Sequence, residues 1–85
     1  MTTLPLPRDE VSVRDLAEAI RGVDRSHAER DRIAAATGLS RSQVYRAIKM
    51  PVRYRDAFCL VAEFYGWRQR AGGAGDHYSF VRRAA

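Results

Sequence analysis

The residues best suited to chemistry are the ten at 40–49, SRSQVYRAIK, which carry three cations and no acid. On a helix of about 3.6 residues per turn, Val44, Ala47 and Ile48 turn inward and Gln43 lies at the boundary. The outward face then consists of Arg41, Ser42, Tyr45, Arg46 and Lys49. An arginine can hold a guanine edge or a phosphate through two parallel hydrogen bonds, which a lysine cannot do. This face therefore suits a polyanionic partner.

The distribution of charge favours the same part of the chain. The 85 residues include 15 Lys or Arg and 10 Asp or Glu, which gives a formal net charge of +5, and the sequence pI is about 10.1. Residues 1–40 hold six Arg and seven acids, a balance of −1, whereas residues 41–85 hold nine basic residues and three acids, a balance of +6. Such a pI is typical of nucleic-acid-binding domains, although a basic surface can also serve solubility alone.

The stretch 30–49, RDRIAAATGLSRSQVYRAIK, meets the demands of two helices that join at a tight turn. A small residue, Ala34, stands where a second helix would cross the first, and Gly38 follows four residues later, where a positive φ is needed. Leu39 fills the corner, and Ser40 caps the second helix in a capping box with Gln43. Further apolar contacts come from Ile33, Val44 and Ile48.

This stretch resembles the bacterial helix-turn-helix family, especially the lactose-repressor and resolvase type, whose turn and recognition helix are similar to GLSRSQVYRAI at 38–48. The resemblance covers 20 of the 85 residues. Ala47 departs from it, because the family usually has a larger aliphatic residue there, and Ile48 is the neighbour that can compensate. The resemblance implies that residues 40–49 form the helix that enters the DNA major groove.

The resemblance also implies roles for individual residues. It implies base contacts from the first part of this helix, namely Arg41, Ser42, Gln43 and Tyr45. It implies phosphate contacts from Ser40, Arg46 and Lys49, and we expect Arg53 and Arg55, just beyond the helix, to extend them. Structural roles remain open for some of these residues. Arg41 can be a solvated helix residue, Gln43 can serve the capping box, and Tyr45 can pack against the next helix. Arg53 and Arg55 can act only as solubilising groups at the start of that helix.

The whole chain is predicted to be all-α, a small bundle of about four helices. Residues 1–11 contain two prolines and no hydrophobic period, so we expect a flexible extended arm, followed by a helix-turn-helix domain over 12–71. GGAG at 72–75 begins a glycine-rich linker and tail over 72–85, in which residues 77–81 form a short strand, a docked segment or a partner-binding tail. The helices are predicted at 12–22, 26–37, 40–49 and 52–70.

Other classes of function find little support. One cysteine, Cys59, and two distant histidines, His27 and His77, do not make a metal cluster, so we expect no metal and no cofactor. There is no Cys-His pair within one segment and no phosphate-binding glycine loop, so we do not expect an enzyme. The sequence lacks an apolar run of about 18 residues and a signal-peptide pattern, so no membrane association and a cytoplasmic location are expected.

The leading hypothesis is a small sequence-specific DNA-binding protein, either a transcriptional regulator or a mobile-element accessory factor such as an excisionase. Its partner is double-stranded DNA, and it is expected to act as a homodimer through the apolar segment 52–70, since one reading helix in one small domain binds weakly. The alternative is a protein-interaction module, an antiactivator that binds and inhibits another regulatory protein. Exposure of the segment from Phe58 to Trp67 would favour that alternative.

Overall fold

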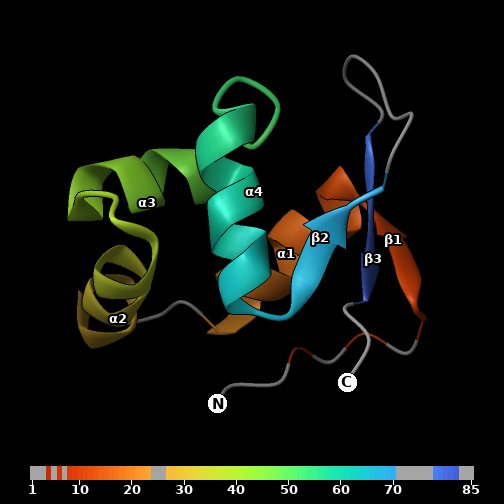
Figure 1. Cartoon of the computed structure of the whole chain (residues 1–85), viewed down its shortest axis with the longest axis horizontal. Helices are drawn as coiled ribbons and strands as arrows, with labels where there is room; N and C mark the ends of the chain where they lie inside the picture. Colours follow the sequence, from red (N-terminus) through yellow and green to blue (C-terminus); the bar gives the residue numbers. More distant parts are fainter. Residues whose placement is uncertain (1–3, 5, 7, 24–26, 71–77, 83–85) are drawn as a thin grey trace.

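A computed structural model describes residues 4, 6, 8–23, 27–70 and 78–82 (Figure 1). In chain order its elements are β1 (Glu10–Ser12), α1 (Val13–Val23), α2 (His27–Thr37), α3 (Arg41–Lys49), α4 (Arg55–Phe64), β2 (Trp67–Gln69) and β3 (Ser79–Arg82). The described residues leave out the predicted start of the second helix at Ser26, the glycine linker at 72–75, His77 and most of the first seven residues.

Four helices make up most of the described residues, in agreement with the predicted helical fold. Helix α1 starts as predicted, because the Ser12 hydroxyl accepts a hydrogen bond of 3.1 Å from the backbone amide of Asp15. Its buried residues recur at the expected spacing of an amphipathic helix and are Val13, Leu16, Ala17 and Ile20.

The helix predicted over 52–70 is wrong at both ends. Residues 51–54 form a turn, and α4 begins only at Arg55. The helix ends at Phe64 because Gly66 has a φ of +83° and turns the chain, after which Trp67 starts strand β2. The apolar character of this segment thus serves one helix and one strand.

A small antiparallel sheet, which the sequence did not lead us to predict, joins the two ends of the chain (Figure 1). Strand β3 lies in the centre and pairs with both neighbours, so that Phe80 stands opposite Val11 on β1 and opposite Gln69 on β2. Of the three alternatives for residues 77–81, the structure thus shows the short strand, at Ser79–Arg82. The last residues of the predicted N-terminal arm also belong to the folded unit.

The core fills the space between this sheet and the helices. Its largest fully buried side chains are aromatic and come from α4, β2 and β3 or the residue before it: Trp67, Tyr78, Phe58 and Phe80. The rings of Phe58 and Phe80 meet edge to face, with 5.5 Å between their centroids. The sheet thus supports α4, and α4 in turn packs against α3 and α2.

Candidate functional site

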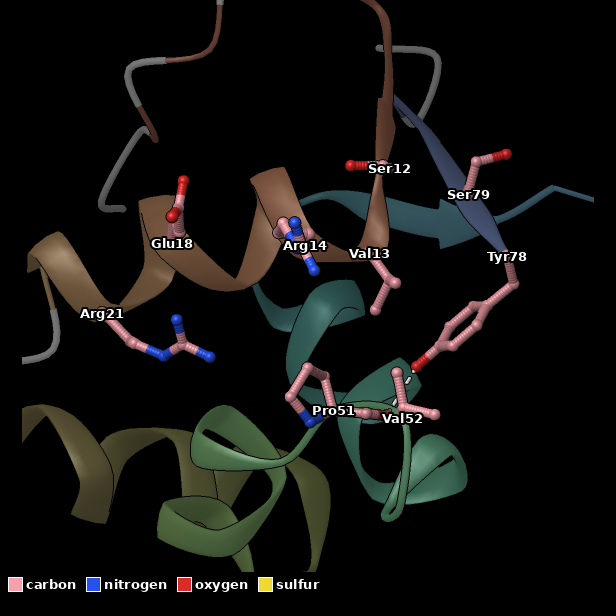
Figure 2. A pocket seen from close by; sticks show the side chains of 9 residues that line it. All are labelled: Ser12, Val13, Arg14, Glu18, Arg21, Pro51, Val52, Tyr78 and Ser79. Atoms are coloured by element: carbon pink, nitrogen blue, oxygen red, sulfur yellow. Dashed lines mark hydrogen bonds between the residues drawn. The ribbon is translucent and has the colours of Figure 1, made fainter. Parts of the chain in front are cut away.

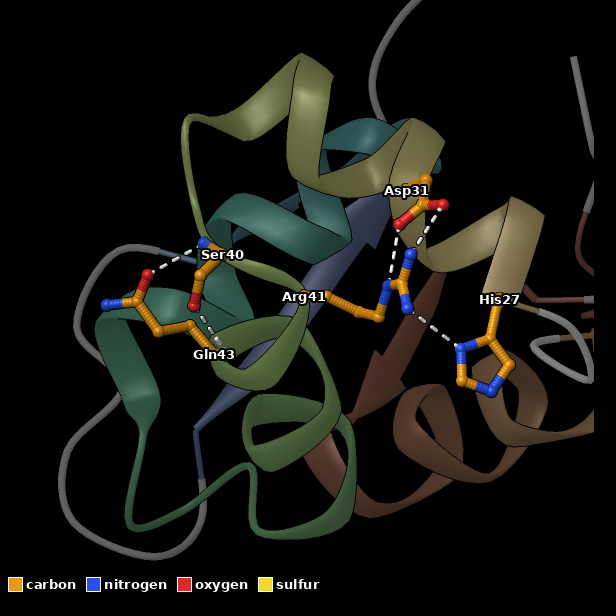
Figure 3. A network of polar contacts seen from close by, with 5 residues as sticks. All are labelled: His27, Asp31, Ser40, Arg41 and Gln43. Atoms are coloured by element: carbon orange, nitrogen blue, oxygen red, sulfur yellow. Dashed lines mark hydrogen bonds and ion pairs between the residues drawn. The ribbon is translucent and has the colours of Figure 1, made fainter.

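A sharp turn of three residues joins α2 to α3. Gly38 has a φ of +80°, a conformation that a residue with a Cβ adopts only at a cost, and its amide donates a 2.9 Å bond to the carbonyl of Ala34. Ser40 is extended and caps α3, with both halves of the predicted capping box present. The Gln43 amide donates to Ser40 Oγ over 3.1 Å, and the Ser40 amide donates to Gln43 Oε1 over 2.8 Å (Figure 3).

The capping box bears directly on two of the predicted DNA contacts. The Ser40 and Gln43 side chains are exposed, but one oxygen of each is engaged in fixing the start of α3. The structural role for Gln43 that the sequence left open is therefore present. A contact from Gln43 to an adenine would have to use its amide group or give up the capping interaction.

Helix α3 divides into two faces as the sequence predicts. Val44 and Ala47 are fully buried and Ile48 is nearly so, which anchors the helix on the rest of the fold. All the remaining residues of the helix are exposed: Arg41, Ser42, Gln43, Tyr45, Arg46 and Lys49. The structure therefore brings the predicted base-reading residues and two predicted phosphate ligands onto one accessible face.

Tyr45 lies at the centre of this face and is 44% exposed. The Arg30 guanidinium is 4.9 Å from the centroid of its ring, and the Lys49 ammonium is 5.6 Å from it, so two cations contact the same phenol ring. One open hollow beside Tyr45 is lined by Arg21, Arg30, Ile48 and Lys49, and another by Arg30, Arg41, Ser42 and Arg46. The Tyr45 ring thus packs against cations of α2 and α3, and it is not buried.

Two arginines of this face were not predicted. Arg30 comes from α2, and Arg21 comes from α1 and donates to the carbonyls of Ile48 and Lys49 at the end of α3, over 3.3 and 3.5 Å. No spacing rule links residue 21 to residue 48, so only the tertiary fold reveals this contact. Together with the cations of α3 they make a cluster from three helices, which we call the basic face: Arg21, Arg30, Arg41, Arg46 and Lys49.

Arg41 is exposed but is not a freely moving side chain. Its Nε donates to Asp31 Oδ1 over 2.7 Å and its Nη2 to Asp31 Oδ2 over 2.9 Å, while its Nη1 lies 3.1 Å from His27 Nδ1 (Figure 3). The hydrogen bond from Arg41 holds the pKa of the Asp31 carboxyl below its usual value, and the same bond raises the pKa of Arg41. The sequence did not indicate either partner.

The two arginines beyond α3 occupy different surroundings. Arg53 is exposed, with its guanidinium 5.6 Å from the ring centroid of Tyr54. Arg55 is half-buried, and its guanidinium lies 4.2 Å from the ring centroid of Tyr78. Arg55 therefore packs against the Tyr78 ring next to β3. Its predicted role as a phosphate ligand did not include this contact.

A hollow larger than the two beside Tyr45 lies elsewhere, between α1, β3 and the turn at Pro51 (Figure 2). Two of its polar groups have structural partners: Ser12 caps α1, and the Tyr78 hydroxyl donates to the carbonyl of Pro51 over 2.7 Å. Burial raises the pKa of Tyr78 to about 12, which makes the phenol a poor acid or base near neutral pH. We therefore assign no chemistry to this hollow.

The residues that the structure describes also offer no site for a metal ion and no reactive thiol. No group of three or more His, Cys, Asp or Glu side chains is placed there to hold a metal ion. Cys59 is half-buried, its thiol donates to Gln69 Oε1 over 3.4 Å, and burial raises its pKa, so it has little thiolate character. Within the same residues, the helices are all too short or too polar to cross a bilayer.

The basic face thus remains as the surface with a distinct chemical character, a group of cations on helices whose backbone is fixed by a glycine turn and a capping box. Comparisons with protein-family models, curated proteins and solved structures gave no match to this chain.

Proposed function

We propose that this protein binds double-stranded DNA, with α2 and α3 acting as a helix-turn-helix and α3 entering the major groove. The observation that carries the proposal is the exposed face of α3, which presents three cations and no acid above a buried apolar side. Arg21 and Arg30 extend the same charge onto the two neighbouring helices. Binding to a polyanion is the chemistry that such a surface serves best.

The dimensions of α3 support this proposal. Nine residues at about 1.5 Å each give a helix roughly 14 Å long, and the diameter of an α-helix with its side chains, about 10–12 Å, fits the major groove, which is about 12 Å wide. Ser42 and Tyr45 lie on the accessible face with Arg46 and Lys49. We assign base contacts to the first part of the face, from Arg41 to Tyr45, and phosphate contacts to Arg46 and Lys49.

The apolar segment of α4 bears on the choice between DNA and a protein partner. Five side chains from Phe58 to Trp67, three on α4 and two just beyond it, are buried in the fold of the single chain: Phe58, Val61, Ala62, Tyr65 and Trp67. Leu60 is the large hydrophobic residue of this segment that is exposed, at 38%. The surface that an antiactivator would offer is therefore small, and this favours the DNA-binding proposal.

Homodimerisation is part of the proposal for a different reason. One short helix reads only one half-site, and specific affinity usually requires two half-sites about 34 Å apart. The buried face of α4 is already used within the chain, so the contact between copies would have to involve other residues. Selection of duplexes from a random pool tests this point, because a dimer of this kind predicts palindromic sequences.

The proposal is tested by the salt dependence of binding to a labelled random-sequence duplex, followed by fluorescence anisotropy. Removing one phosphate ligand should reduce the steepness of log K against log salt by about 0.9, so Arg46→Ala and Lys49→Ala should each give a shallower slope than the parent. Arg68→Ala is the matched control, because Arg68 is exposed on β2, on the sheet rather than on α3.

The result that contradicts the proposal is equally defined. A parent protein that does not bind the duplex at low salt is not a DNA-binding protein of this kind. If Arg68→Ala weakens binding as much as Arg46→Ala does, the protein binds DNA through general charge and the assignment to α3 is wrong.

A further inference from the structure

The pairing of Arg41 with residues of α2 suggests how the basic face discriminates between sequences. Asp31 takes two N–H groups of the Arg41 guanidinium, at 2.7 and 2.9 Å, and His27 Nδ1 lies 3.1 Å from the third nitrogen (Figure 3). All three guanidinium nitrogens thus have a neighbour on α2. Arg30 and Arg46 line a hollow together with Arg41, and Asp31 is the acid that contacts Arg41.

The position of the Asp31 carboxylate on Arg41 matters chemically. The edge formed by Nε and Nη2 is one of the edges through which a guanidinium grips a phosphate or a guanine bidentately. Here a carboxylate occupies that edge, and it has the same planar pair of oxygens and the same sign of charge as a DNA phosphate offers. A DNA phosphate near α3 must therefore displace Asp31 and tolerate its negative charge nearby.

Both partners of this pair remain accessible to such an exchange. Their side chains are each 52% exposed, so solvent and ligands reach the ion pair without any change in the fold. An exposed pair of this kind is weak enough to be exchanged for another acceptor. The alternative acceptor has to match both the geometry and the position that Asp31 fixes.

We propose that Asp31 is a specificity-determining residue, which holds Arg41 on α2 and so removes it from the non-specific phosphate contacts of the basic face. On random DNA, Arg41 stays paired with Asp31, contacts no phosphate and therefore releases no counterions from the DNA. In a target that places a guanine edge, a bidentate acceptor without a negative charge, beside α3, Arg41 exchanges partners. A repulsive element such as Asp31 raises specificity by weakening the wrong complexes more than the right one. This inference rests on the proposed DNA-binding function.

The test compares Asp31→Asn with a matched control on the other side of the molecule. Glu10→Gln also removes one negative charge and also frees one exposed arginine, Arg70, but it lies in β1, far from α3 (Figure 1). Binding of each variant to a random-sequence duplex is measured as a function of salt. Circular dichroism checks folding, and Asp31→Ala serves as a second variant.

Asp31→Asn is expected to steepen the salt slope by about 0.9 and to tighten binding to random DNA about eightfold at ~0.1 M salt, since one more cation then contacts phosphate. Glu10→Gln should leave the slope unchanged. The gain in affinity for random DNA should vanish when Asp31→Asn is combined with Arg41→Ala, because Asp31 acts through Arg41. The gap in affinity between random and selected duplexes should also narrow.

The outcomes separate the two levels of the proposal. If the parent binds DNA and loses salt slope with Arg46→Ala, but Asp31→Asn behaves like Glu10→Gln, the role of Asp31 is wrong and the DNA-binding function stands. A gain from Asp31→Asn that persists without Arg41 also overturns the inference, since it would then come from net charge. If the parent does not bind the duplex, both proposals fail.

Discussion

Replacement of Gly38 by alanine tests the turn on which the orientation of α3 depends. Gly38 has a φ of +80°, and a Cβ built there meets no atom within 4 Å outside Gly38 and its two chain neighbours, so the cost of the substitution comes from the backbone alone. The left-handed conformation costs an L-residue roughly 1–2 kcal/mol, and the smaller entropy of the unfolded alanine chain offsets about 0.4–1 kcal/mol of it. The expected net loss of unfolding free energy is therefore about 1 kcal/mol.

The chain provides its own control for this prediction. Gly22 lies within α1, where a Cβ also meets nothing within 4 Å and the backbone is helical, so Gly22→Ala should stabilise the protein by roughly 0.5–1 kcal/mol. Two chemically identical substitutions at open positions are thus expected to have opposite signs. Gly66→Ala, at a φ of +83°, should behave like Gly38→Ala.

Urea unfolding followed by tryptophan fluorescence measures these differences directly. Trp67 is the single tryptophan of the chain and is 1% exposed, so its emission reports the loss of the core. In a domain of this size, 1 kcal/mol also corresponds to a shift in Tm of roughly 4–8 °C. If Gly38→Ala is neutral or stabilising like Gly22→Ala, the turn between α2 and α3 does not have the geometry described above.

Two single hydrogen-bonded groups give further predictions. Ser40→Ala removes one half of the capping box and should lower the free energy of unfolding by about 1 kcal/mol in the same urea assay, and a decrease below about 0.3 kcal/mol would show that the box is not formed in solution. Tyr78 has a pKa raised to about 12, chiefly by burial, whereas an unfolded tyrosine loses its proton near pH 10. Its contribution to the free energy of unfolding should therefore be complete below pH ~10 and be lost as the pH rises toward about 12. The variant Tyr78→Phe should not show this decline between about pH 10 and 12. Equal pH dependence of the unfolding free energy in the two proteins would contradict the buried position of the phenol.

The local features of α2 and α3 were predictable because they depend on neighbours in the sequence. A glycine four residues after Ala34 and a serine three residues before Gln43 act through contacts within one turn, and both appear in the structure where the sequence placed them. The inward side of α3 followed from the helical period alone. Such patterns report local backbone geometry, which the rest of the fold preserves here.

The sheet could not be predicted in the same way. The apolar run up to Trp67 reads equally well as buried helix or buried strand, and the positive φ of Gly66, which separates the two, is not visible in the sequence. Strand β1 pairs with residues about 70 positions away on β3, and no local pattern encodes such a partner. Three-residue strands also offer too few positions for an alternation to be recognised.

The candidate site shows the same division. The exposed residues of α3 followed from one helical wheel, whereas Arg21, Arg30 and the pairing of Arg41 with Asp31 arise from contacts between helices. The sequence therefore predicted which residues of α3 are exposed. It did not identify the side chains that support and restrain the helix from α1 and α2.

The central claim is that α3 is the surface that meets DNA. Amide chemical-shift mapping during titration with a short duplex tests it most directly, because it reports the contact residue by residue. We expect the largest shifts at Arg41 to Lys49 and at Arg30, with small shifts on the three strands. Shifts centred on the sheet, or none at all at low salt, would contradict the claim.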